Sequence, residues 1–324
     1  MLRRLASRSS ICLLMLFMSG AALSQQVQFN FRSFDVDLPG ATGTGALGIN
    51  PEGDIVGRYF VGAASHSFLL SDGTATNVDP PFGISGTSQA WGINPRGYIV
   101  GLYTDQGTVP GGDALRTRAF LRDRSGNFTS IDFPGAENTF AIKISRRGQV
   151  VGCYHHQNKD FAVSGGGTMH GYVYHDGTYE SFPVPGTMHN GITRDGRIIV
   201  GVWYPTPSEF HAYKVENGVY SLLNLPDYAV LSDARDVNPS GEIVGFFVDR
   251  SNTNHGFLLN KEGFTQIDFP GANVVLTRTL GIDPEGNVVG QYINKDAMGV
   301  LHPHGYIATR SREDEDSSTS PDLN

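Results

Sequence analysis

A short motif returns six times along this chain of 324 residues, and the repeat constrains the fold more than any other feature. Its first copy, over residues 48–57, is Gly-Ile-Asn-Pro-Glu-Gly-Asp-Ile-Val-Gly. The turn glycines of successive copies lie 44 to 51 residues apart, at Gly53, Gly97, Gly148, Gly196, Gly241 and Gly286. A period of this length with β-branched residues is typical of a propeller blade. The 41 glycines also disfavour a helical fold, because Gly costs roughly 1 kcal/mol at each helix position.

Each repeat predicts four strands. The first strand ends at the Ile-Asn pair, and the Asn-Pro-x-Gly that follows is a turn in which Pro sets φ and Gly takes positive φ. The β-branched Ile-Val-Gly-x-Tyr run is the second strand. A third strand such as 255–259 and a fourth such as 264–269 complete the unit. Pro270 ends it, because proline cannot continue a hydrogen-bonded ladder.

The two ends of the repeat region are complementary. The last unit stops after a third strand at 304–307, whereas residues 34–40 resemble the fourth-strand end at 266–271. We therefore expect an all-β, six-bladed β-propeller over residues 25–309, with four-stranded blades and with the N-terminal strand completing the last blade. Such closure covers strand edges that would otherwise pair with other chains. A twelve-strand double sheet or an open solenoid is the alternative interpretation.

Residues 1–24 predict a signal peptide. Three arginines precede a short apolar run over 11–18, and small residues follow it. We therefore expect a secreted or periplasmic protein, with no membrane insertion because no second apolar stretch occurs. Cys153 is then the only cysteine of the mature chain, and we interpret it as a buried structural thiol rather than a nucleophile.

The charge pattern excludes one class of partner. The net charge is −8 and the chain has no Lys/Arg block. Because nucleic-acid affinity depends on Lys and Arg contacts to phosphates, we expect no nucleic-acid partner. Residues 310–324 are acidic and Ser-rich with nothing to bury, which predicts a disordered acidic tail.

The chain resembles bacterial extracellular proteins of the HAF-repeat family, which are named for a His-Ala-Phe-like triplet in each unit. The matching triplets begin at His66, Arg118, His170, His211, His255 and His304. The resemblance covers nearly all of residues 29–308 and implies export and a repeat fold. The family has no assigned activity, so the resemblance implies no catalytic residues.

Most of these triplets lie at a fixed spacing from an acid. His66 precedes Asp79 by 13 residues, and Arg118 precedes Asp132 by 14. In a hairpin, this spacing places the cation opposite the carboxylate, with Cβ atoms about 5 Å apart. We therefore expect structural pairs rather than a catalytic centre: His66–Asp79, Arg118–Asp132, His255–Asp268 and, through ring closure, His304–Asp37. By the same spacing His211 faces Asn224, and His170 faces Pro183 and is expected to be unpaired.

Departures from the repeat are where we expect a ligand to bind. The loops between second and third strands are long in blades 2, 3 and 6. In these loops His155, His156, Asp160 and Asp105 provide the ligand types of a divalent metal site. A polar surface loop without a metal is the alternative.

A second set of candidates lies on the predicted first strands, near the ring axis. These positions do not repeat: Gln89, Met188, His189, Asp233, Arg235 and Arg278. Two hypotheses fit Asp233, Arg235 and Arg278, namely an anion or sugar pocket and a solvated network of ion pairs.

These features favour a binding or interaction module for a protein or glycan, acting through the face that carries the long loops of blades 2, 3 and 6. We expect a monomer with no cofactor beyond the metal considered above. The alternative is a metal-assisted hydrolase or lyase with a pocket at the channel mouth. We favour binding because the sequence has no Gly-x-Ser-x-Gly, P-loop or Cys-x-x-Cys motif.

Overall fold

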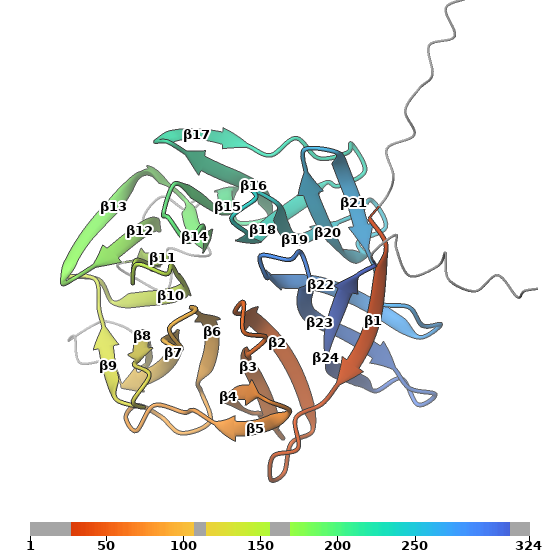
Figure 1. Ribbon diagram of the computed structural model, residues 1–324, viewed down its shortest axis with the longest axis horizontal. Helices are drawn as coiled ribbons and strands as arrows, with labels where there is room; N and C mark the ends of the chain where they lie inside the picture. Colours follow the sequence, from red (N-terminus) through yellow and green to blue (C-terminus); the bar gives the residue numbers. More distant parts are fainter. Residues whose placement is uncertain (1–26, 107–114, 156–168, 312–324) are drawn as a thin grey trace, which may run out of the picture.

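The computed structural model describes residues 27–106, 115–155 and 169–311. The predicted signal peptide (1–24), His156, Asp160 and nearly all of the predicted acidic tail lie outside these residues. All the regular secondary structure of these residues consists of β-strands. The described part of the chain contains no helix long and apolar enough to cross a membrane. The sheets stand around a central axis, as Figure 1 shows, so the fold is an all-β propeller.

Four of the sheets have four antiparallel strands each, and in each of them the strand order is the chain order. We call them units 1 to 4. Their strands are β2 (Gly43–Ile49), β3 (Ile55–Val61), β4 (Ala64–Ser71) and β5 (Thr74–Asn77); β6 (Gln89–Ile93), β7 (Ile99–Gln106), β8 (Leu115–Arg122) and β9 (Phe128–Ile131); β10 (Asn138–Ile144), β11 (Val150–His155), β12 (His170–His175) and β13 (Thr178–Pro185); β14 (Thr187–Ile192), β15 (Ile198–Thr206), β16 (Glu209–Glu216) and β17 (Val219–Leu222).

The remaining strands form one eight-stranded sheet. Its first part, unit 5, contains β18 (Leu231–Val237), β19 (Ile243–Val248), β20 (Asn254–Asn260) and β21 (Gly263–Ile267). Its second part, unit 6, contains β22 (Val274–Ile282), β23 (Val288–Lys295), β24 (Leu301–Arg310) and, from the other end of the chain, β1 (Phe29–Phe34). A single parallel bridge, Asn254 to Leu276, joins the two parts. Strand β1 pairs with β24 over six residues.

Glycine in the Ile-Val-Gly motif is required by close packing. Every first strand carries a β-bulge, and in unit 1 it lies between Ala46 and Gly48. A Cβ on Gly57 would lie 2.0 Å from the Gly45 carbonyl oxygen and 2.7 Å from the Phe68 ring. Any side chain here would therefore push two strands apart. The aromatic residue that ends each triplet fills this space with no solvent exposure: Phe68, Phe120, Tyr172, Tyr213, Phe257 and Tyr306.

The core lies between neighbouring sheets. One apolar cluster combines Val244 and Leu258 of unit 5 with Ile282 and Val288 of unit 6, and Phe31 of β1 packs against it. Each sheet therefore buries its faces against its two neighbours, as a propeller requires.

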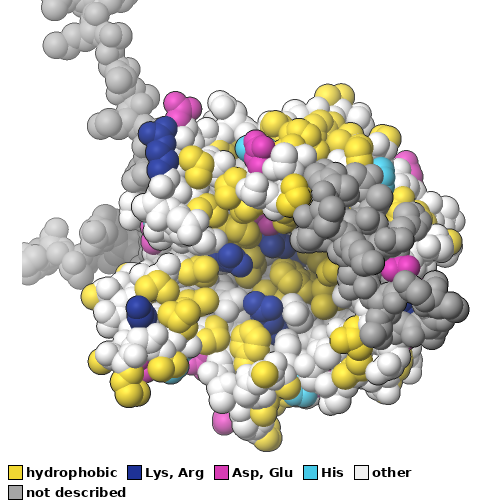
Figure 2. All heavy atoms as spheres, turned by 180° about the vertical axis from the view of Figure 1, so that it is seen from behind, with side chains coloured by type: hydrophobic (Ala, Val, Ile, Leu, Met, Phe, Trp, Pro, Cys, Tyr) yellow, Lys and Arg dark blue, Asp and Glu magenta, His cyan; other side chains and the backbone are white. Residues whose placement is uncertain are grey.

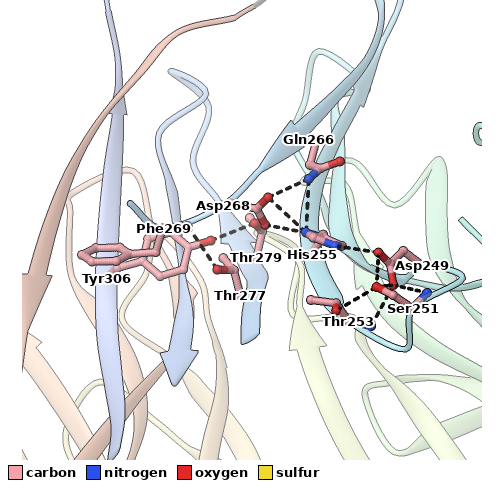
Figure 3. A network of polar contacts seen from close by, with 10 residues as sticks. All are labelled: Asp249, Ser251, Thr253, His255, Gln266, Asp268, Phe269, Thr277, Thr279 and Tyr306. Atoms are coloured by element: carbon pink, nitrogen blue, oxygen red, sulfur yellow. Dashed lines mark hydrogen bonds and ion pairs between the residues drawn. The ribbon is translucent and has the colours of Figure 1, made fainter. Parts of the chain in front are cut away.

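The triplet histidines lie between an aromatic ring and a carboxylate. In unit 1 the His66 ring stacks on Tyr59, with ring centres 5.2 Å apart, and its Nδ1 lies 2.6 Å from Asp79 Oδ2. In unit 5 His255 stacks on Phe247, with ring centres 5.1 Å apart. Figure 3 shows the His255 ring beside Asp268, whose Oδ1 lies 2.9 Å from His255 Nδ1. Each histidine thus ties the second strand of its sheet to the end of the fourth.

The other units use the same position with different partners. Arg118 Nη1 lies 2.5 Å from Asp132, as the spacing predicts. The structure contradicts the expectations for His170 and His211. His170 is not unpaired, because its Nδ1 lies 2.9 Å from the Phe182 carbonyl oxygen. His211 is 2.9 Å from Glu209 of its own strand rather than paired with Asn224.

The expected pair between His304 and Asp37 is wrong. His304 Nδ1 lies 2.8 Å from Asp35 Oδ2. Because Phe34 pairs with Gly305 in the ladder, the residue opposite His304 is Asp35. The closing strand has two more residues between its acid and the Pro-Gly stop than the fourth strand ending at Asp268, so alignment on Pro-Gly selected the wrong carboxylate.

This register can be tested with two matched variants. Asp35→Ala should lower the free energy of unfolding by about 0.2–1 kcal/mol, the range of a partly exposed ion pair. Asp37→Ala removes the same charge from an exposed side chain two residues away and should leave stability unchanged. Urea denaturation of both variants measures the difference, and a larger loss in Asp37→Ala would show that the register is different.

Candidate functional site

The proposed metal ligands do not form a site among the described residues. His155 is buried at the end of β11 and its ring stacks on Phe140, with centres 5.5 Å apart. Asp105 lies on β7, and its carboxylate is 3.4 Å from Arg118 Nε. The described part of the chain contains no group of three His, Cys, Asp or Glu side chains that could hold a metal ion. His156 and Asp160 lie outside it.

His189 does not face the ring axis, contrary to our expectation. It occupies the position that is Ala46 in unit 1 and Ala234 in unit 5, directly opposite the glycine of the second strand. Successive strand residues point to opposite faces, so this position faces the core between sheets. His189 Nδ1 lies 2.5 Å from the Tyr213 hydroxyl, and burial lowers the pKa of His189 to about 3. The imidazole is therefore neutral and lines a cavity of about 390 Å³ between units 3 and 4.

Three arginines meet at the axis on the face where second strands end and third strands begin. They are Arg58 of β3, Arg235 of β18 and Arg278 of β22, which belong to units 1, 5 and 6. Figure 2 shows Lys and Arg side chains gathered in the hollow at the centre of this face, surrounded by apolar surface. We call this feature the axial hollow. The sequence hypothesis included Arg235 and Arg278 but missed Arg58.

Arg58 and Arg278 are held in place by neutral amides. Arg58 donates from Nη1 to Gln89 Oε1 and from Nη2 to Gln291 Oε1, both at 3.3 Å. Arg278 donates from Nε and Nη2 to Asn254 Oδ1, at 3.2 and 3.0 Å. Amide oxygens orient a guanidinium group without neutralising its charge.

Among the described residues, Arg235 is the one arginine of the three that forms an ion pair with a carboxylate. Its Nη2 lies 3.0 Å from Asp233 Oδ2, and Asn190 of unit 4 donates to the other oxygen of Asp233 at 2.8 Å. Burial raises the pKa of Asp233, and the charges of Arg235 and Arg278 oppose this rise. Asp233 is thus committed to the network that positions Arg235.

Aromatic rings pack against the guanidinium groups. The Arg235 guanidinium lies 5.4 Å from the ring centre of Trp91 and 5.4 Å from that of Phe246. Arg278 stacks on Phe246 at 4.4 Å. A guanidinium that stacks on a ring keeps its N–H edge available for paired hydrogen bonds to a planar or tetrahedral oxyanion.

The axial hollow carries excess positive charge. Burial, followed by the charges of Arg278 and Arg235, lowers the pKa of Arg58 to about 10. Burial and the neighbouring Arg235 also lower the pKa of Arg278. Within the described residues Arg58 Nε, Arg235 Nε and Trp91 Nε1 are buried without a hydrogen-bond partner. Three cations therefore share one carboxylate in a protein whose net charge is −8.

Below the hollow, a buried ion pair spans the axis. Lys143 Nζ of unit 3 lies 3.0 Å from Asp236 Oδ2 of unit 5 and donates to the carbonyls of Leu47 and Leu280. At the equivalent position the other four units have glycine: Gly48, Gly92, Gly191 and Gly281. A Cβ on Gly92 would lie 2.7 Å from the Ile142 carbonyl oxygen, so the backbones approach too closely for side chains there.

Comparisons with known proteins support the fold. A scan against protein-family models found no match, and neither did a search of curated proteins. Among solved structures, the β-propeller domain of the Trilobed protease from Pyrococcus furiosus has a TM-score of 0.51 at 11% identity, covering 87% of this chain and 85% of that one. The acylaminoacyl peptidase of Pyrococcus horikoshii has 0.50 at 13%, covering 84% of this chain but only 45% of that one.

Aleuria aurantia lectin has a TM-score of 0.48 at 11% identity, covering 89% of this chain and 99% of that one. At such identities the likeness to the two Pyrococcus proteins shows a shared β-propeller fold and nothing about activity.

Removal of Lys143 tests the ion pair at the axis. Lys143→Met should lower the free energy of unfolding by about 3 kcal/mol, because it leaves the carboxylate of Asp236 buried without a counter-charge. The double variant Lys143→Met/Asp236→Asn should recover part of this loss, because it removes the buried charge as well. Chemical denaturation checks both, and an equal or larger loss in the double variant would contradict this explanation.

Removal of Arg58 should have the opposite effect on stability. Arg58→Met keeps the apolar stem but removes a buried cation that two other arginines repel, so we expect a gain of about 0.5–1 kcal/mol in the free energy of unfolding. Arg32→Gln is the control, because it removes one positive charge from an exposed position on β1. Loss of stability in Arg58→Met, measured by thermal and urea denaturation, would mean that Arg58 has a structural role.

Proposed function

We propose that this chain is an exported binding module of HAF-repeat type, which takes its ligand in the axial hollow. The proposed architecture is a six-bladed propeller closed by β1. Two observations support it: units 5 and 6 are joined by only one parallel bridge, and β1 lies in the fourth-strand place beside β24. Export rests on the signal-peptide pattern of residues 1–24.

The convergence of Arg58, Arg235 and Arg278 is the observation that carries the proposal. The positions that hold the sheets together repeat from unit to unit, whereas those that face the hollow differ in every unit. The residue after the second-strand glycine is Arg58, Leu102, Cys153, Val202, Phe246 or Gln291. Charged groups that repel one another weaken the fold, so their presence at one point favours a role in binding.

The chemistry of the hollow favours binding over catalysis. Of the described carboxylates, Asp233 is the one within ion-pair distance of these arginines, and it is held by Arg235 and Asn190. A general acid or base needs a group that can exchange a proton with the substrate. The hydrolase or lyase hypothesis depends on metal ligands; the described residues contain no group of three that could hold a metal ion, and His156 and Asp160 lie outside them.

The shape of the hollow favours a glycan over a protein surface. Concave sites with aromatic walls and a few convergent polar groups are typical of small-molecule ligands. The second strands of units 2, 3 and 6 end on this face, and the long loops that follow them in units 2 and 3 lie largely outside the described residues. The described part of the unit 6 loop is ordered by Asp296, which lies 3.1 Å from His302 Nε2.

A glycan array with three forms of the full mature protein tests this function. The native protein should bind a defined set of glycans, and Arg278→Met should lose about tenfold or more in affinity because the hollow loses a guanidinium that touches the ligand. Arg32→Gln should bind as the native protein does. Glycan binding that is equal in all three forms, or absent in all three, would contradict a site in the axial hollow.

A further inference from the structure

We infer that the ligand of the axial hollow is an acidic saccharide, a sugar whose ring carries a carboxylate or a sulfate group. This inference rests on the proposed binding function and names the class of ligand. It follows from three features of the hollow: its charge, the meeting of two guanidinium groups at one aromatic ring and the neutral amides around them.

The charge of the hollow requires an anion. Arg58, Arg235 and Arg278 come from three different units, and within the described part of the chain only Arg235 forms an ion pair with a carboxylate. The partners of the other two are the amide oxygens of glutamine and asparagine side chains. The described residues therefore leave two of the three positive charges without a counter-charge of their own, in a half-buried place where a charged ligand interacts more strongly than in open water.

The geometry of the arginines leaves donors for that anion. Arg278 uses Nε and Nη2 to bind Asn254, and Arg235 uses Nη2 to bind Asp233. Arg235 Nε and Trp91 Nε1 have no hydrogen-bond partner in the described part of the chain. The guanidinium groups of Arg235 and Arg278 meet at Phe246, whose ring lies against both. An oxyanion that reaches this point accepts charge-assisted bonds from two guanidinium groups.

The remaining groups suit the neutral part of a sugar. Gln89, Gln291 and Asn254 present amide groups beside the arginines, and amides both donate to and accept from hydroxyl groups. Tyr204 is close enough to the cluster for the charges of Asp233, Arg235 and Arg278 to act on its hydroxyl. A bare inorganic anion can contact only the arginines, whereas a hydroxylated ring with one anionic substituent can contact both the arginines and the amides beside them.

Matched pairs of sugars test the class of ligand by isothermal titration calorimetry. The first pair is trigalacturonate and its methyl ester, and the second is galactose 6-sulfate and galactose. At least one acidic member should bind about tenfold or more tightly than its neutral counterpart, and the pair that shows this distinguishes carboxylate from sulfate. That preference should disappear in Arg278→Met and persist in Arg32→Gln. Thermal denaturation of both variants establishes that they are folded.

Three results would overturn the inference. If neutral and acidic members bind equally and Arg278→Met weakens both, the ligand is not an acidic sugar, but the proposed binding site stands. If inorganic sulfate displaces the acidic sugars and binds at least as tightly as any of them, the hollow binds simple anions rather than acidic sugars. If none of the four sugars binds, the inference fails, and the glycan array then decides separately whether the hollow binds any glycan.

Discussion

The close approach of backbones around the axis is the constraint on which this structure depends. A Cβ on Gly48 would lie 2.8 Å from the Trp91 carbonyl oxygen, and one on Gly191 would lie 2.8 Å from the Asp236 Cα. Glycine in four units therefore lets the first strands meet, and the two charged residues Lys143 and Asp236 fill the space that is left. On the side where the second strands end, side chains rather than backbones face the axis, and the axial hollow forms there (Figure 2).

The repeat predicted much of this architecture. It predicted the four strands of each unit, the turn glycines, whose φ values lie between 75° and 87°, and the pairs His66–Asp79, Arg118–Asp132 and His255–Asp268. It failed where one copy differs from the rest. The closing strand is not a tandem copy, so alignment on its Pro-Gly stop misplaced the carboxylate that pairs with His304, which is Asp35. His189 was also misplaced, because it occupies a core position that is alanine in four other units.

Arg58 was missed because it lies inside the repeated motif, at a position where every copy has a different residue. Whether Arg58 can contact a ligand depends on which way its side chain points. Strand β3 pairs Arg58 with Gly45, and β19 pairs Phe246 with Asp233, so the residue after the second-strand glycine faces the axis in every unit. A variable position within a regular repeat is thus the place where such a ring acquires a ligand site, while the repeated residues maintain the scaffold.

The central claim is that three guanidinium groups in the axial hollow lack sufficient negative charge and are there to bind an anion. Crystals of the protein soaked in selenate, whose anomalous scattering locates the ion, test it most directly. The claim predicts an anomalous peak within hydrogen-bond distance of Arg235 and Arg278. A map with no peak in the hollow, and with these side chains turned away from the axis toward other carboxylates, would contradict it.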